Sequence, residues 1–396
     1  MSLSTLFSRA SRDPLNAAKT RRAIGYLGWN VPVELIIAAD AVPVHLGALP
    51  ALPETSLADR FLESSFSAQS RGVAQHWLAG ELDSFDAVIF SRSDDNAQRL
   101  YYYLCELQRM GVCKGPTPHL YDLARIQRGT SVAHTIESTR SLAAAIGVDE
   151  SKLLAATERV AAREKLLADL LKLRTADQVP LGSIAHRIVR AARTEWSDEW
   201  DASLQEWLSS CAKVAPRNKV ALVGSVPPDE HIHAAIEMDG TVVVGEINEA
   251  SFIAWAHGDI DQAASVTWAR GDIDQGSSVA WERGETNGAS SVAPERAVLD
   301  ASVEAIARRY YDGTNAISTL LQSPRDLVNA ARTLRADGVI VWMVATDTGL
   351  AWQAPRIERA LREAGLPTLM LTSQPQTLNA EALTQIAYFR RTLEAQ

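Results

Sequence analysis

Residues 23–47 read AIGYLGWNVPVELIIAADAVPVHLG, and this stretch decides the fold class. Its first apolar run, residues 23–28, ends in glycine, as a buried parallel strand does. Pro32 and Glu34 then begin a predicted helix through VELIIAADA, and VPVHLG returns as a second strand. Strand, helix and strand in such close succession predict a parallel α/β unit.

The same alternation continues along the chain. FDAVIF at residues 85–90 predicts a third strand, followed by the polar turn SRSDDN and an amphipathic helix that ends at Gly111. Residues 129–214 then place apolar side chains at three-to-four spacing, which is typical of helices. The remaining predicted strands lie at residues 219–225, 241–247, 339–345 and 367–373.

We therefore predict an α/β protein with two flavodoxin- or Rossmann-like parallel-sheet lobes joined by a helical linker. The predicted bounds are an N-terminal arm at residues 1–20, an N-terminal lobe at 21–128, the linker at 129–214 and a C-terminal lobe at 215–396. In the last lobe, residues 256–294 form three imperfect 13-residue repeats. We expect a solvent-exposed insertion there; a substrate lid or a partner-docking flap is the alternative.

Composition excludes several classes of function. The net charge of -9 argues against a nucleic-acid partner, because phosphate binding needs a basic face. No long apolar run and no secretory signal are present, so we expect neither a membrane span nor export. Cys105, Cys113 and Cys211 form no Cys-x-x-Cys pair and suit a reducing compartment. The predicted location is the cytoplasm.

Several motifs, in order, resemble those of one family. The matching positions of the first motif are Pro32, Glu34, Leu35, Ala38, Ala39, Pro43, Val44 and Leu46, and SRSDDNAQRLY, ALVGSVPPDE, GTVVVGEIN and RADGVIVWMVATD follow. Together they resemble the 2-hydroxyacyl-CoA dehydratase and benzoyl-CoA reductase family, which includes the 2-hydroxyglutaryl-CoA dehydratase D-component. The resemblance implies two flavodoxin-like lobes, an acyl-CoA substrate and a [4Fe-4S] cluster that cysteines hold between the lobes.

The chain departs from the family at those cysteines. Their positions fall on Asp94 (or on Ser93 if the register slips by one), near Asn248 and near Thr346. Iron–sulfur clusters need thiolate ligands, and carboxylate, amide and hydroxyl groups do not replace them. We therefore expect no cofactor on this chain, and a [4Fe-4S] cluster only where a partner subunit supplies it.

The candidate catalytic residues are Asp94 and Glu34, as acid–base groups. The candidate substrate-binding residues are Ser93, Asp95, Asn96, Ser225, Asn248 and Thr346, which lie at predicted strand ends. A structural interpretation stays open for Glu34 as a helix-start carboxylate and for the SRSDDN turn as a helix cap. We expect no metal site, since His231 and His233 would face different sides of their helix.

The leading functional hypothesis is an acyl-CoA-binding subunit without its own cluster, acting in a homo- or hetero-oligomer with a cluster-bearing homologous partner. A second hypothesis is a cluster-independent enzyme that uses Asp94 and Glu34 on a CoA thioester. A third is a non-catalytic scaffold or binding protein. If the chain is an enzyme, the resemblance implies a lyase of the hydratase or dehydratase type.

Overall fold

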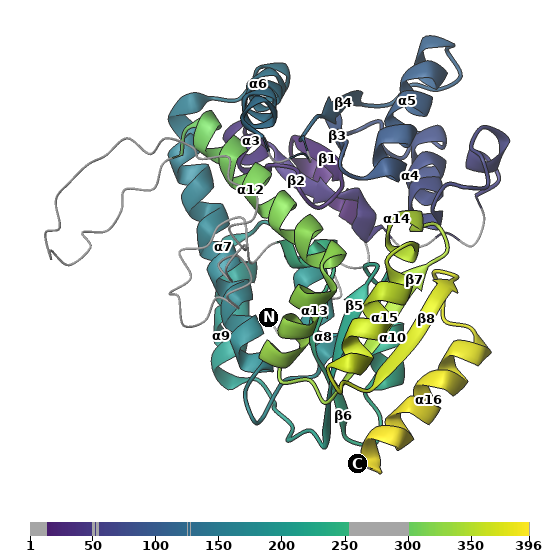
Figure 1. Cartoon of the computed structure of the whole chain (residues 1–396). Helices are drawn as coiled ribbons and strands as arrows, with labels where there is room; N and C mark the ends of the chain where they lie inside the picture. The colour runs from purple at the N-terminus through teal and green to yellow at the C-terminus, as the bar shows by residue number, and fades with distance from the viewer. Residues whose placement is uncertain are drawn as a thin grey trace, which may run out of the picture.

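The computed structural model describes residues 14–49, 52, 55–124, 126, 128–252 and 301–395. The predicted repeat insertion at 256–294 and most of the predicted arm at 1–20 lie outside the described residues. Within them, the chain forms two four-stranded sheets, both wholly parallel (Figure 1). The strand orders are β2-β1-β3-β4 and β6-β5-β7-β8, so the two sheets share one topology. The predicted two-lobed α/β fold is confirmed.

The N-terminal lobe is built on the first sheet. Its strands are β1 (Ala23–Leu27), β2 (Val42–His45), β3 (Ala87–Ser91) and β4 (Thr117–Tyr121). Its helices are η1 (Pro14–Asn16), α2 (Ala17–Thr20), α3 (Val33–Ala38), η2 (Leu46–Ala48), η3 (Ala58–Arg60), α4 (Ala68–Leu78) and α5 (Asp95–Arg109). The first three strands are wholly buried, which explains their continuous apolar sequences.

A run of helices links the two lobes. These are α6 (Gly129–Ile146), η4 (Glu150–Lys152), α7 (Leu153–Arg174), α8 (Gly182–Ala191) and α9 (Asp198–Ser210). Apolar residues of α7, α8 and α9, among them Leu170, Ile188 and Trp200, form a small core of their own. No helix in the described part of the chain, including the 22-residue α7, is both long and apolar enough to cross a membrane.

The C-terminal lobe is built on the second sheet. Its strands are β5 (Asn218–Gly224), β6 (Thr241–Ile247), β7 (Gly338–Val344) and β8 (Thr368–Gln374). Its helices are α10 (His231–Ile236), η5 (Glu249–Phe252), α12 (Val303–Gln322), α13 (Pro324–Thr333), α14 (Thr348–Ala351), α15 (Ala354–Glu363) and α16 (Ala380–Glu394).

In each lobe, one glycine at the end of a central strand allows the backbone to approach the neighbouring strand closely. Gly28 follows β1 with a φ of +104°, and a Cβ there would lie 2.5 Å from Cβ of Ser91 on β3. Gly224 ends β5 with a φ of +121°, and a Cβ there would lie 2.2 Å from the carbonyl oxygen of Trp342 on β7. Only glycine meets both demands. The two lobes therefore bring their central strands together in the same way.

Helix α12 connects the C-terminal lobe to the N-terminal lobe. In Figure 1 it runs from beside α6 down to α13, next to the second sheet. The Tyr310 hydroxyl donates to Oε2 of Glu34 at 2.9 Å, and the Tyr311 hydroxyl donates to the carbonyl oxygen of Ile126 at 2.8 Å. One continuous apolar core includes residues of both lobes and of α12. The lobes are therefore packed together as well as linked by the chain.

Candidate functional site

Polar side chains gather where strands of both sheets end. We call Asn30, Ser91, Ser93, Asp94, Ser225, Thr314 and Asp347 the interlobe polar cluster. The first four follow or end β1 and β3, Ser225 follows β5, and Asp347 follows β7. Thr314 comes from α12. Figure 1 shows α14, which begins just after Asp347, lying between the second sheet and the helices of the N-terminal lobe.

Asn30 is the centre of the hydrogen bonds on the N-terminal side. Its side chain is buried, its Nδ2 donates to Oγ of Ser93 at 2.5 Å, and its Oδ1 accepts from Oγ of Ser91 at 2.5 Å. The Ser91 and Ser93 hydroxyls lie 2.8 Å apart. Nδ2 of Asn30 also donates to Oγ1 of Thr314 at 3.2 Å. Through Thr314, α12 becomes part of the cluster.

Asp94 is the N-cap of α5. Its Oδ1 accepts from the backbone N–H groups of Asn96 at 2.9 Å and Ala97 at 3.2 Å. Burial raises the pKa of Asp94 above its ordinary value, although these two hydrogen bonds oppose the shift. The negative charges of Asp347 and Asp95 raise this pKa further. A carboxylate of one lobe thus changes the proton affinity of a carboxylate in the other.

The C-terminal side of the cluster joins the ends of β5 and β7. The Ser225 hydroxyl donates to Oδ2 of Asp347 at 2.9 Å and accepts from the backbone N–H of Val344 at 3.1 Å. Oδ1 of Asp347 accepts from the N–H of Leu350 at 3.4 Å and caps α14. Thr346 lies half-buried just before Asp347. The predicted residues Ser225 and Thr346 therefore lie at the same edge of the sheet.

Other predicted site residues have different surroundings. Asp95 is exposed at the first position of α5. Oδ1 of Asn96 accepts from the backbone N–H of Ser67 at 3.0 Å, which joins the start of α4 to the start of α5. Asn248 is buried, and its Nδ2 donates to Oε2 of Glu246 at 3.2 Å. These contacts give Asn96 and Asn248 structural roles in addition to the predicted one.

Glu34 lies in a buried group of charged side chains. Its side chain is fully buried, and its partners include the Tyr310 hydroxyl and, at 3.7 Å from Oε1, Nη2 of Arg309. Burial raises the pKa of neighbouring Glu164 to about 8, against the opposing charge of Arg193. Since Glu34 has no exposed surface, a ligand reaches it only after side chains around it move.

The cysteines do not provide a thiolate site at the strand ends. Cys105 lies within α5, Cys113 follows that helix, and Cys211 ends α9. Burial raises the pKa of both Cys105 and Cys113, which favours their protonated, non-ligating form. The positions on which the resemblance places the family's cysteines carry the oxygen or amide groups of Asp94 (or Ser93), Asn248 and Thr346. This donor set does not fit a [4Fe-4S] cluster.

Four residues of the cluster are absent from the sequence-based prediction: Asn30, Ser91, Thr314 and Asp347. Asn30 lies three residues after β1, and Asp347 is adjacent to the predicted Thr346, so their places near strand ends are a usable signal. Thr314 has no such signal, because it lies inside a helix far along the chain. Its role becomes visible only when α12 is placed against the N-terminal lobe.

Comparison with known families gives one match. A family model described as 2-hydroxyglutaryl-CoA dehydratase, D-component, matches residues 28–270, which is more than half of the chain. The matched range begins at Gly28 and includes the first sheet's remaining strands, the linker helices, β5 and β6. The motifs at β7 and β8 lie beyond it. No curated protein matches the chain.

Proposed function

The chain belongs to the 2-hydroxyglutaryl-CoA dehydratase D-component family, and from this premise we propose that it is the acyl-CoA-binding subunit of its enzyme. One observation carries the proposal: strand ends of both sheets meet in the interlobe polar cluster. Open parallel α/β sheets bind their ligands beyond the carboxyl ends of the strands. The thioester end of the substrate would lie at this cluster.

The chemistry of the cluster suits a thioester. Amide and hydroxyl groups such as those of Asn30, Ser93 and Ser225 donate hydrogen bonds to a carbonyl oxygen once they release a present acceptor, such as Oγ1 of Thr314 for Asn30 and Oδ2 of Asp347 for Ser225. Ser91, Ser93 and Asn30 are already fixed by hydrogen bonds to one another, so little order is lost on binding. Asp94, with its raised pKa, is the group that would exchange a proton with the substrate.

The redox group of the family would come from another subunit. The described strand ends present no thiolates, and the chain's three cysteines lie elsewhere. We therefore propose a cluster-bearing homologous subunit as the partner. Stoichiometric iron and labile sulfide in this chain, purified alone under anaerobic conditions, would contradict this part of the proposal.

A second function is favoured by the electrostatic link between Asp94 and Asp347. Neighbouring carboxyl groups whose proton affinities differ can divide the roles of general acid and general base. In this function the chain acts on a CoA thioester by acid–base chemistry alone, without a cluster. Asp94 would be the acid, because its pKa is raised, and Asp347 is the nearby carboxylate.

Calorimetric titration with several CoA thioesters tests the proposal. We expect the wild-type chain to bind at least one thioester, and Asp94→Asn to change turnover more than stability, because Asn caps a helix as well as Asp does. Asp86→Asn is the matched control: Asp86 precedes β3, at the opposite end from Asp94, and pairs with Arg22. No binding of any thioester to the wild type would reject both functions.

Turnover assays then separate the two functions. The first function predicts that the chain alone does not convert the CoA thioester, and that conversion begins after a cluster-bearing partner is added. The second predicts conversion by the chain alone, which Asp94→Asn lowers by about 10²–10⁴. Asp86→Asn should retain wild-type turnover in either case.

A further inference from the structure

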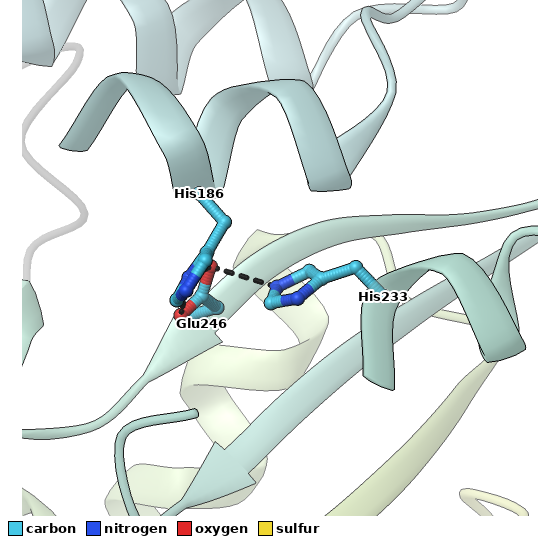
Figure 2. Close-up of side chains that lie close together, drawn as sticks. All are labelled: His186, His233 and Glu246. Atoms are coloured by element: carbon cyan, nitrogen blue, oxygen red, sulfur yellow. Dashed lines mark hydrogen bonds and ion pairs between the residues drawn. The ribbon is translucent and has the colours of Figure 1, made fainter. Parts of the chain in front are cut away.

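A second group of chemically active side chains lies away from the interlobe polar cluster. It consists of His186 from α8, His233 from α10 and Glu246 from β6. Figure 2 shows the three side chains pointing toward one another from three separate elements. Both imidazole rings are buried, with exposed fractions of 3% and 0%, and the Glu246 side chain is 12% exposed.

The distances in this group are those between the ligands of a metal ion. Nδ1 of His186 lies 3.3 Å from both carboxylate oxygens of Glu246, and Nε2 of His233 lies 3.0 Å from Oε1. One donor atom from each residue lies within 4.8 Å of the others. In a tetrahedral zinc site with bonds of about 2.0–2.2 Å, neighbouring ligand atoms are about 3.3 Å apart.

The charge that these residues offer also suits a dication. A metal-bound histidine is neutral and a metal-bound carboxylate is ionised, so two histidines and Glu246 together supply a single negative charge to the ion. The nearby guanidinium groups of Arg174 and Arg190 balance part of it.

Glu246 holds the group together in the absence of an ion. Both buried rings turn a nitrogen to the same carboxylate, which also accepts from Nδ2 of Asn248. The outer nitrogens, Nε2 of His186 and Nδ1 of His233, have no hydrogen-bonding partner in the described part of the chain. The nitrogens that face a common point beside Glu246 are therefore the inner ones, Nδ1 of His186 and Nε2 of His233.

We propose that His186, His233 and Glu246 together bind one divalent transition-metal ion of the zinc type. Imidazole nitrogen with a single carboxylate favours Zn²⁺, Co²⁺ or Fe²⁺ over Mg²⁺ and Ca²⁺, which prefer oxygen ligands. The site uses no residue of the interlobe polar cluster, although Asn248, a predicted substrate-binding residue, donates to its ligand Glu246. Because its ligands come from α8, α10 and β6, the ion fixes a linker helix to the C-terminal sheet.

His231 distinguishes this site from a surface histidine pair. It lies on the same helix as His233 but is 76% exposed, and its Nδ1 lies 2.8 Å from Oδ2 of Asp229. The expectation that His231 and His233 face different sides is therefore confirmed. The sequence argument that excluded a metal compared only these two residues, whereas the partner of His233 is His186, from the linker.

Metal titration of the chelator-treated full-length chain tests the proposal. We expect one Co²⁺ per chain with visible d–d absorption, displacement of Co²⁺ by one Zn²⁺, and a higher thermal midpoint with Zn²⁺ but not with Mg²⁺. Competition between Fe²⁺ and Zn²⁺ under anaerobic conditions shows which of the two ions the site binds more tightly. A wild-type chain that takes up no Co²⁺ or Zn²⁺ at equimolar concentration overturns the proposal.

Variants then assign the ligands. His233→Gln and Glu246→Gln should each weaken zinc binding by at least about 100-fold, whereas His231→Gln, the matched control on α10, should leave it unchanged. Circular dichroism shows which variants remain folded. If both ligand variants fold and still bind one Zn²⁺ with wild-type affinity, the site lies elsewhere. If neither folds, the wild-type titration alone decides.

Discussion

Glu164 is a carboxylic acid held inside the protein. It lies on α7 with only 7% of the residue exposed. Burial raises its pKa to about 8; the charges of Arg193 and Arg163 lower it, and that of Glu34 raises it. At pH 7 this side chain therefore keeps its proton in the folded protein. In the unfolded chain a glutamate ionises near a pKa of about 4.3.

This difference in pKa makes stability depend on pH. Above about pH 4.3 the unfolded chain releases the Glu164 proton while the folded chain retains it, so the unfolded state gains stability as pH rises. The loss of folding stability has a slope of up to about 1.4 kcal/mol per pH unit and ends near the folded pKa of about 8. Glu164→Gln removes the titrating group and should flatten this decline.

Urea unfolding at about pH 5.5 and about pH 8.5 measures the effect. The wild type should lose more stability between these two values than Glu164→Gln. Glu158→Gln, at an exposed position of the same helix, should behave like the wild type. Equal losses in the wild type and in Glu164→Gln would show that Glu164 is ionised in the folded protein.

Among the helices, α8 depends on a side chain from another element for its start. Oε1 of Glu237, the residue after α10, accepts from the backbone N–H of Gly182, and Oε2 accepts from the N–H and the hydroxyl of Ser183, at 3.0 and 2.7 Å. A carboxylate at a helix N-terminus accepts hydrogen bonds from the free N–H groups there and interacts favourably with the positive end of the helix dipole. Glu237 therefore holds α8 in place while His186, further along α8, faces Glu246.

Removing this carboxylate should loosen α8. We expect Glu237→Ala to lower the free energy of unfolding by about 1–2 kcal/mol, the usual range for a lost N-terminal cap. Chemical denaturation measures the free energy of unfolding. Glu230→Ala is the control, because Glu230 precedes α10 and its carboxylate lies 3.9 Å from Arg187. Equal stability of Glu237→Ala and the wild type would show that water replaces the cap at no cost.

The sequence predicts most elements because their sequences are strongly patterned. TVVVGEI at 241–247 coincides with β6, since a continuous β-branched run is buried on both faces. The predicted strands do not include TPHLY at 117–121, because this segment is short and contains Pro118. In the structure it forms β4, a half-buried strand at the edge of the first sheet. Helix α10 begins only at His231, because Oδ1 of Asp229 accepts a hydrogen bond from the backbone N–H of His231 and forms a turn before the helix.

Over the whole molecule, the candidate site is less predictable than the fold. Asp94 and Ser225 could be selected because strand ends are recognisable in the sequence. Their meeting depends on how the two sheets face each other, and no local pattern encodes that. Glu34 shows the same limit: its place at the start of α3 was predicted, but its contact with Tyr310 joins residues far apart in the chain.

The contact between Tyr310 and Glu34 should contribute measurably to the stability of the whole molecule. Both side chains are buried, so Tyr310→Phe removes one hydrogen bond without changing the packing. We expect a loss of about 1–3 kcal/mol in the free energy of unfolding. Tyr388→Phe, at an exposed position of α16, is the control. If both variants unfold at the same urea concentration as the wild type, the contact contributes nothing.

The return of the chain through α12 has a mechanical consequence. Two lobes joined by a single linker can rotate relative to each other about that linker. Here α12 provides a second connection between the lobes. Rotation of one lobe would break the hydrogen bonds of Thr314 with Asn30 and of Tyr310 with Glu34. A ligand that enters the interlobe polar cluster by separating the lobes would therefore have to break these hydrogen bonds and the apolar contacts of α12.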